Sequence, residues 1–129
     1  MPTEFTINQE HGLVISRGTG VFTREDYLDH MSRVKADPRF SPDFNQLVDC
    51  RAISKMDLSG MQIRDIASRT VFDVRSRRAF VVSSEVHFTM TCVFGTFRQI
   101  NAGQEVGVFR EWHEACSWLG LPPEFHLTF

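Results

Sequence analysis

The chain has 129 residues, a length that corresponds to one domain. Apolar residues make up 42% and charged residues 23%, which is typical of a folded globular domain and excludes extensive disorder. Fourteen Lys and Arg against sixteen Asp and Glu give a formal net charge of −2, which argues against binding to duplex nucleic acid or to an anionic membrane surface. The 12 Phe residues are an unusually large share and predict an aromatic core or an apolar binding surface.

The cysteines and histidines show no spacing typical of a metal or redox motif. Cys50, Cys92 and Cys116 are an odd number, and no secretory leader precedes them. We therefore expect no metal and no cofactor, and a reducing, cytoplasmic location. The apolar runs are shorter than the roughly 20 residues that a membrane-spanning helix requires, so no transmembrane segment is expected.

The N-terminal half predicts a hairpin, a helix and a buried strand. Residues 4–8 and 13–17 are rich in β-formers, and a turn at Gly12 would join them into the hairpin. Thr23 is a suitable N-cap for a helix over residues 24–36, which the sequence Asp37-Pro38 ends. The short apolar run over residues 46–50 predicts the buried strand.

The C-terminal half predicts three helices that alternate with two strands. The second helix opens near Ser59, and its apolar face is expected to contain Ile63, Ile66, Ala67, Thr70 and Val74. A strand over residues 79–82 precedes a third helix, capped by Ser83 or Ser84 and ended near Gly103. Its predicted buried stripe is Val86, Met90, Val93, Phe97 and Ile100. A strand over residues 105–109 and a fourth helix with Trp112, Ala115, Cys116 and Leu119 on one face complete the domain.

The predicted order is β-β-α-β-α-β-α-β-α in a single domain over residues 1–121, followed by a C-terminal tail over residues 122–129. This alternation indicates an α/β fold with a mixed sheet of four or five strands and about four helices. The predicted core comprises Ile15, Leu47, Val48, Ile66, Val81, Val93, Val108 and Leu119. Ligands of such sheets usually bind at the carboxyl ends of the strands, so the loops after Cys50 and Val82 are the first candidates.

The segment after the third predicted strand carries the most specific pattern. Leu47-Val48-Asp49-Cys50 is followed by Ile53-Ser54-Lys55-Met56 and by Asp57-Leu58-Ser59-Gly60-Met61. These residues resemble the switch region of anti-anti-sigma factors, which are STAS domains. The element order is also similar, and more narrowly the chain resembles the SpoIIAA-like, or STAS/SEC14-like, branch of small bacterial proteins. The resemblance implies a SpoIIAA/STAS-like fold and a partner-binding switch region at Asp57, Leu58, Ser59, Gly60 and Met61.

Leu58 departs from the pattern of that family. In anti-anti-sigma factors a partner kinase phosphorylates the residue directly after the Asp, and a leucine has no hydroxyl at this position. We therefore expect the usual phosphorylation switch to be absent, because Ser59 occupies the second position of the motif, which is not the usual acceptor. Asp57 and Ser59 would then either cap the helix or recognise a partner or an anionic group at its start.

Two charged groups and one aromatic surface are further candidates. Asp49 and Arg51 are expected to pair in a loop that could contact a partner. A basic cluster, Arg69, Arg75, Arg77 and Arg78, is interpreted as a solvated end of the second helix or as a patch for an anionic partner. On the third helix, Phe88, Cys92 and Phe94 widen the apolar arc and predict a dimer surface or the wall of an apolar pocket, unless Phe125, Leu127 and Phe129 of the tail cover them.

Together these patterns predict a non-enzymatic regulatory or protein-interaction module with a protein partner and a possible homodimer. No nucleophile–base pair, metal set or cofactor loop can be assembled from residue spacing, and the choice among binding functions depends on the family resemblance. The alternative is a carrier or sensor of a small apolar, lipid-like ligand, which the SEC14 side of the resemblance implies.

Overall fold

The computed structural model describes residues 2–123 and 125. In this part of the chain the strands are β1 (Thr3–Asn8), β2 (Leu13–Thr23), β3 (Asn45–Asp57), β4 (Arg77–Val81) and β5 (Glu105–Phe109). The helices are α1 (Arg24–Ala36), α2 (Gly60–Ala67), α3 (Glu85–Ala102) and α4 (Trp112–Trp118). The predicted α/β element order is confirmed.

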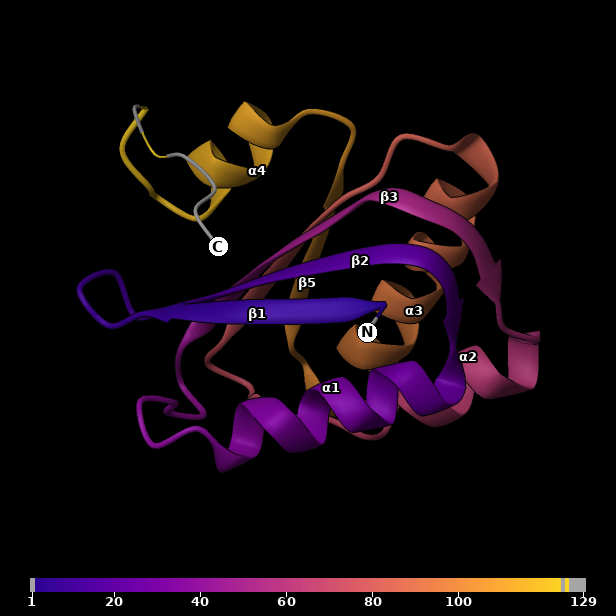
Figure 1. Cartoon of the computed structure of the whole chain (residues 1–129), viewed down its shortest axis with the longest axis horizontal. Coiled ribbons are helices and arrows are strands. Elements are labelled where there is room, and N and C mark those ends of the chain that lie inside the picture. Colours follow the sequence, from indigo (N-terminus) through magenta and orange to yellow (C-terminus); the bar gives the residue numbers. More distant parts are fainter. Residues whose placement is uncertain (1, 124, 126–129) are drawn as a thin grey trace.

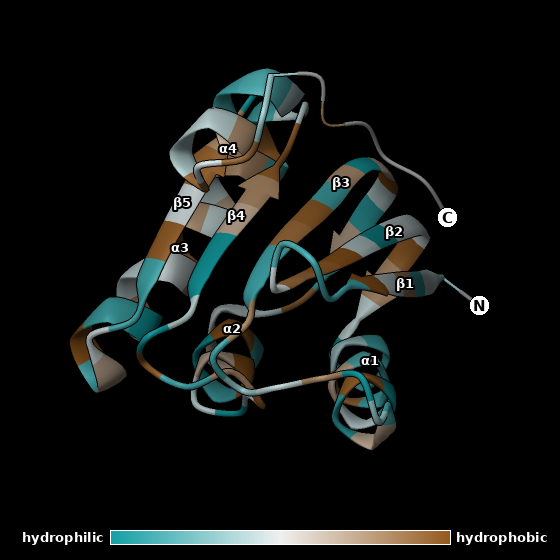
Figure 2. Ribbon diagram, turned by 90° about the vertical axis from the view of Figure 1, so that its left-hand side faces the viewer, coloured by the Kyte–Doolittle hydropathy of each residue, from teal (hydrophilic) through white to brown (hydrophobic). Residues whose placement is uncertain are grey.

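The strands form one mixed sheet in the order β1-β2-β3-β4-β5. β1 is antiparallel to β2, and the three other neighbouring pairs are parallel. Helices α1, α2 and α3 cover one face of the sheet, whereas α4 packs against the other face (Figures 1 and 2). The sheet is therefore the middle layer between two apolar cores.

Alternation along the strands divides side chains between these two cores. In β2, Val14 faces α1 to α3, whereas Leu13 and Ile15 face α4. In β3, Leu47 packs on the α4 side, and Cys50 packs on the side of the other helices. Both faces of the central strands are buried, as expected for parallel strands with helices on either side.

Side-chain caps position three of the helices. Thr23 and Asp26 form a capping box at the start of α1, and Ser59 and Gln62 form another at the start of α2. Ser84 accepts a hydrogen bond from the backbone N–H of His87 and begins α3. The hydroxyl-bearing residues identified in the sequence at these three positions are thus confirmed as helix starts.

β3 is longer than predicted and bends away from β4. Its pairing with β4 ends at Asp49, but its pairing with β2 continues to Asp57. Two register shifts interrupt that second pairing, and Gly20 adopts a φ of 67° at one of them. The distal halves of β2 and β3 consequently curve away as a two-stranded ribbon (Figure 1).

The predicted buried stripe of α3 is wrong for three of its five residues, whereas Met90 and Phe97 are partly buried against the core. Val86, Val93 and Ile100 are exposed, so the assignment of Val93 to the core was also wrong. The buried residues are instead His87, Thr91, Phe94, Gly95 and Arg98. Thr91 and Arg98 are buried with hydrogen-bond partners: Thr91 Oγ1 donates to the backbone oxygen of His87 at 2.7 Å, and Arg98 donates to Ala67 and Gln104.

α2 is shorter than its predicted apolar face. It ends at Ala67, and Val74 is exposed in the following loop. The loop returns the chain toward the sheet within about ten residues, so Thr70 and Val74 belong to no helix. Within the part of the chain that the structure describes, no helix is both long enough and apolar enough to cross a membrane.

Candidate functional site

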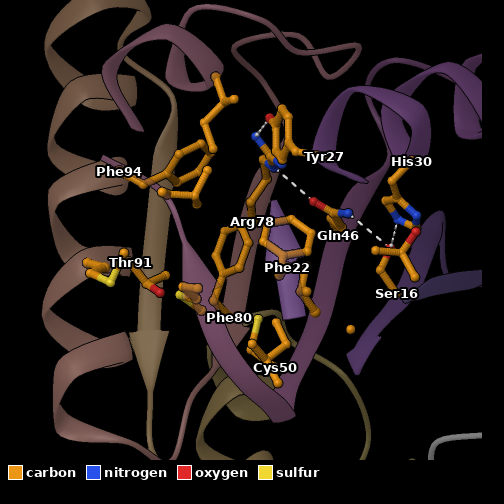
Figure 3. A pocket seen from close by; sticks show the side chains of 18 of the residues that line it. Ser16, Phe22, Tyr27, His30, Gln46, Cys50, Arg78, Phe80, Thr91 and Phe94 are labelled. Carbon is orange, nitrogen blue, oxygen red and sulfur yellow. Dashed lines mark hydrogen bonds between the residues drawn. The ribbon is translucent and has the colours of Figure 1, made fainter. Parts of the chain in front are cut away.

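A cavity of about 80 Å³ lies between the sheet and helices α1 to α3. Most of its wall consists of apolar side chains from β2, β3, β4 and all three helices (Figure 3). The apolar lining residues are Phe22, Met31, Val48, Cys50, Ile53, Met56, Leu58, Ile63, Ile66, Phe80, Met90 and Phe94. An apolar hollow in a close-packed domain is unusual, because such interiors rarely contain voids larger than a water molecule.

The bend of β3 opens this cavity toward the surface. Phe22, Met56, Leu58 and Met90 line the cavity and are only half-buried. They come from the ends of β2 and β3, from the start of the α2 segment and from α3. These four half-buried side chains form the rim of the cavity. The rim lies on the side of the sheet where the parallel strands end, as expected for this class of fold.

A chain of hydrogen bonds crosses the floor of the cavity. His30 Nε2 lies 2.8 Å from Ser16 Oγ, which accepts a hydrogen bond from Gln46 Nε2 at 3.0 Å. Gln46 Oε1 in turn accepts a hydrogen bond from Arg78 Nε at 2.9 Å. The guanidinium group of Arg78 reaches the hydroxyl of Tyr27 at the end of the chain (Figure 3). Five side chains from four elements are thus joined in one buried network.

The Ser16–His30 pair resembles a nucleophile and its base, but its electrostatic surroundings do not suit that role. Burial, together with the positive charges of Arg33 and Arg78, lowers the pKa of His30 from 6.5 to about 4. Such an imidazole is a weak base at neutral pH. Its Nδ1 atom has no hydrogen-bond partner among the described residues, so no carboxylate there orients the ring. The pair is therefore suited to holding a fixed hydrogen bond.

Arg78 is the most unusual residue in this wall. Only 1% of its surface is exposed, and its guanidinium group lies 5.0 to 5.5 Å from the rings of Phe72, Phe80 and Phe94. The predicted solvated basic cluster is therefore wrong for Arg78, which is buried. Its position within an apolar strand, next to Ala79 and Phe80, was the available signal for burial.

Cys50 lines the cavity beside these residues. Burial, and to a smaller extent the charge of Asp49, raises the pKa of the Cys50 thiol to about 12. A thiol with this pKa remains protonated at neutral pH and is a poor nucleophile. Cys50 therefore contributes to the wall as a small apolar group.

The predicted switch segment, residues 57–61, lies partly over the cavity. Ser59 caps α2, and Asp57 is the exposed last residue of β3. Leu58 lines the cavity. Met61 is 86% exposed. One short segment thus presents one apolar side chain to the cavity and another to the solvent.

Asp49 and Arg51 do form the expected ion pair, but they lie within β3 and do not line the cavity. Arg51 Nε donates to Asp49 Oδ1 at 2.9 Å, and its guanidinium group lies 5.6 Å from the ring of Trp112 in α4. Burial works to raise the pKa of Asp49, but hydrogen bonds from Arg51 outweigh it and hold that pKa below its ordinary value. This pair joins β3 to the α4 layer.

The residues of the aromatic surface predicted on α3 lie in two different environments. Phe94 is buried and lines the cavity. Phe88 and Cys92 are half-buried and lie outside the lining, and the guanidinium group of Arg110 covers the Phe88 ring at 4.0 Å. Phe125 packs with the α4 core, 5.7 Å from the ring of His11, and does not cover α3. Leu127 and Phe129 lie outside the described residues.

A metal site has no support in the described residues, where no three His, Cys, Asp or Glu side chains form a group that could bind an ion. The candidate site is therefore the cavity, with its apolar wall, its buried polar chain and the rim that includes Leu58. Sequence reasoning identified Leu58 and Phe94 but missed the polar chain, because its members lie far apart in the sequence.

Comparison with solved structures finds several chains of similar architecture, among them a crystal structure. It is of an uncharacterized protein of the DUF3478 family from Shewanella loihica PV-4, described as having a SpoIIAA-like fold. The two chains are 17% identical, and the match covers 91% of each with a TM-score of 0.58. This chain has a SpoIIAA-like fold. The fold expectation is thus confirmed, although no protein-family model and no curated protein matches the chain.

Proposed function

We propose that this protein is a non-enzymatic binding module that holds a small, largely apolar molecule in the cavity beneath α1 to α3. The observation that carries the proposal is the cavity itself: an apolar hollow with a half-buried rim, within an otherwise packed SpoIIAA-like fold. Small-molecule sites are typically concave and apolar, with a few polar groups that fix orientation, and this cavity has both features.

The volume of the cavity limits what it can hold. An apolar cavity of about 150 Å³ is known to bind benzene, and a single water needs roughly 10–15 Å³. At about 80 Å³, roughly half of that volume, the cavity encloses about three non-hydrogen atoms, and a slightly longer molecule would extend to the half-buried rim. A long acyl chain would fit only if the rim residues moved apart, so the ligand that suits this state is small.

The same site favours a second, compatible function in protein recognition. Leu58 contacts the cavity, and three residues later Met61 projects into solvent. A ligand that fills the cavity would contact Leu58 and shift the conformation of the exposed residues of this segment, residues 57–61. Ligand occupancy would then act on the partner-binding region where anti-anti-sigma factors use a phosphoryl group.

A cavity-filling variant tests the binding function. Val48→Phe places a larger side chain in the wall, whereas Val21→Phe makes the same change at an exposed position of β2 that is not in the wall. We expect wild type and V21F to bind butan-1-ol in NMR titrations with shifts at the cavity residues, and V48F to lose this binding. Equal binding by V48F and wild type would contradict the proposal.

A partner-recognition test uses the exposed end of the same segment. Affinity capture from the native cell with wild type and with Met61→Asp would compare the proteins retained. The partner function predicts a stoichiometric protein retained by wild type and lost from M61D, whose substitution at an exposed side chain should leave the fold unchanged. A partner retained equally by both would place its binding surface elsewhere.

A further inference from the structure

Arg78 carries a charge that its surroundings solvate but do not neutralise. Its side chain is almost fully buried, and among residues 2–123 and 125 no carboxylate forms an ion pair with it. Its hydrogen-bond acceptors are neutral oxygens of Gln46, Tyr27 and Thr70. Lys, Glu, Arg and Asp are almost never fully buried unless they are paired, so Arg78 requires an explanation.

The terminal N–H groups of Arg78 make only weak hydrogen bonds. Only the bond from Nε to Gln46 is short, at 2.9 Å. The terminal nitrogens reach Tyr27 and Thr70 at 3.4 to 3.5 Å, distances at which such bonds are weak. A guanidinium group has five N–H donors, so its terminal N–H groups can still bind a stronger acceptor.

Arg98 provides an internal comparison. It is also a buried arginine without an ion pair in the described part of the chain, with 4% of its surface exposed. Its donors, however, are well used: Arg98 bonds the backbone oxygen of Ala67 and Gln104 Oε1, each at 2.9 Å. The Ala67 oxygen belongs to the carboxyl end of α2, where a positive charge is favoured. Arg98 therefore has a structural role, and it does not line the cavity.

The position of Arg78 connects its charge to the cavity. Arg78 is one of the lining residues, and the wall around it is made mainly of aliphatic and aromatic side chains. A molecule bound there would meet the cationic group of Arg78 and a mainly apolar surface elsewhere, because Arg17, another arginine of the lining, is paired with Glu4. This combination selects an amphipathic molecule with a single compact anionic group.

We propose that Arg78 binds the carboxylate group of the cavity ligand, so that the ligand is a short-chain monocarboxylate. This inference rests on the proposed binding function and adds the ligand class. A carboxylate matches the planar fork of a guanidinium group and concentrates its charge on two adjacent oxygens. A phosphate would need donors for more oxygens, and the rings of Phe80 and Phe94 beside the guanidinium group supply none. The cavity volume encloses about three non-hydrogen atoms, so the carboxylate group of butanoate would lie inside and its short chain would extend to the half-buried rim.

The test compares three molecules that share one carbon chain. Butanoate, butan-1-ol and butylammonium would be titrated into the isotope-labelled full chain in a carboxylate-free buffer, with NMR shifts at the cavity residues as the measurement. We expect butanoate to bind at least about tenfold more tightly than butan-1-ol, because charge-assisted hydrogen bonds are the stronger ones, and butylammonium not to bind. Inorganic phosphate and chloride complete the series and report any general affinity for anions.

Two variants assign the preference to Arg78. Arg78→Met keeps an unbranched side chain of similar reach and removes the charge, so R78M should bind butanoate no better than butan-1-ol. Arg98→Met is the matched control, because it removes a second buried arginine that does not line the cavity, and it should keep the preference for butanoate. Retained binding of butan-1-ol by R78M would show that the variant is folded and its cavity intact. If R78M does not fold, Arg78→Lys gives the same comparison, with a weaker preference for butanoate expected.

The possible outcomes separate this inference from the function on which it rests. Equal binding of butanoate and butan-1-ol by wild type would overturn the carboxylate assignment and leave the apolar binding function standing. No binding of any of the three molecules would overturn both. Binding of phosphate or chloride in preference to butanoate would overturn the assignment in favour of an inorganic anion. A preference for butanoate that R78M retains in full would remove Arg78 from the site, and one that R78K retains in full would overturn the role given to the planar guanidinium group.

Discussion

His30 predicts a specific dependence of stability on pH. Its pKa of about 4 in the folded protein compares with 6.5 for an unperturbed histidine, because burial and the nearby Arg33 and Arg78 disfavour the imidazolium ion. Asp29 acts in the opposite direction but is the smallest of the four influences. As the pH falls below 6.5, the unfolded chain therefore binds a proton that the folded protein does not, and acidification favours unfolding.

The size of this effect follows from the two pKa values. One pKa unit corresponds to 1.36 kcal/mol, so the free energy of unfolding should fall by about 3 kcal/mol in total as the pH passes from above 6.5 to below 4. About 2 kcal/mol of this loss should occur between pH 7 and pH 5. This window lies above the range in which the carboxyl groups with lowered pKa, such as Asp49, become protonated.

Urea unfolding at pH 7, 6 and 5 measures this dependence, with the fluorescence of Trp112 and Trp118 as the signal. His30→Gln should lower the stability at pH 7 but lose much less additional stability at pH 5 than wild type does. His113→Gln, at an exposed position of α4, serves as the control and should behave as wild type does. An equal loss by H30Q and wild type between pH 7 and pH 5 would refute the assignment to His30.

Four further expectations concern single positions. Gly107→Ala would place a Cβ atom 2.6 Å from Phe109 Cε2, so we expect a loss of about 1–3 kcal/mol in urea unfolding; an unchanged midpoint would show that the ring moves freely. Ser59→Ala removes the acceptor for the Gln62 backbone N–H at the start of α2 and should cost about 1 kcal/mol by the same assay, whereas no loss would mean that the capping box is dispensable. Leu58→Ser should create a phosphorylation site for an anti-sigma-type kinase, measured by intact mass with ATP; stoichiometric phosphorylation of wild type at Ser59 would contradict the expected absence of the switch. Cys50 should resist iodoacetamide at pH 8 in the folded protein and react after unfolding in urea, and rapid alkylation without denaturant would show that the cavity wall opens widely.

Much of the fold follows from local chemistry that is visible in the sequence. The start of α1 at Thr23 and the end of α3 at Gly103 depend on interactions within a few residues, and both were predicted correctly. The buried face of α3 was not predicted correctly, because a prediction from apolar periodicity treats polar residues as exposed to solvent. Arg98 is buried through partners that are distant in the sequence or lie beyond the end of the helix, and a periodicity analysis does not include them.

The polar part of the site could not be predicted for a related reason. Ser16, His30, Gln46 and Arg78 come from β2, α1, β3 and β4, and only the register of the parallel strands brings them together. Gln46 and Arg78 are direct neighbours across β3 and β4 in that register. A shift of one residue would turn either side chain toward α4, and short apolar strands do not specify such a register in the sequence.

The sequential strand order has a consequence for how the protein folds. Each strand pairs with the strand that precedes it along the chain, so every parallel pair closes through one local β-α-β connection. The entropy cost of closing each connection is therefore modest. The sheet can extend strand by strand from its N-terminal hairpin as the chain leaves the ribosome. Arg78 takes its place in the cavity wall only when β4 pairs with β3, and Phe94 does so only after α3 has packed against the sheet. The cavity should thus be among the last features to form during synthesis, when β1 to β3 already provide its floor.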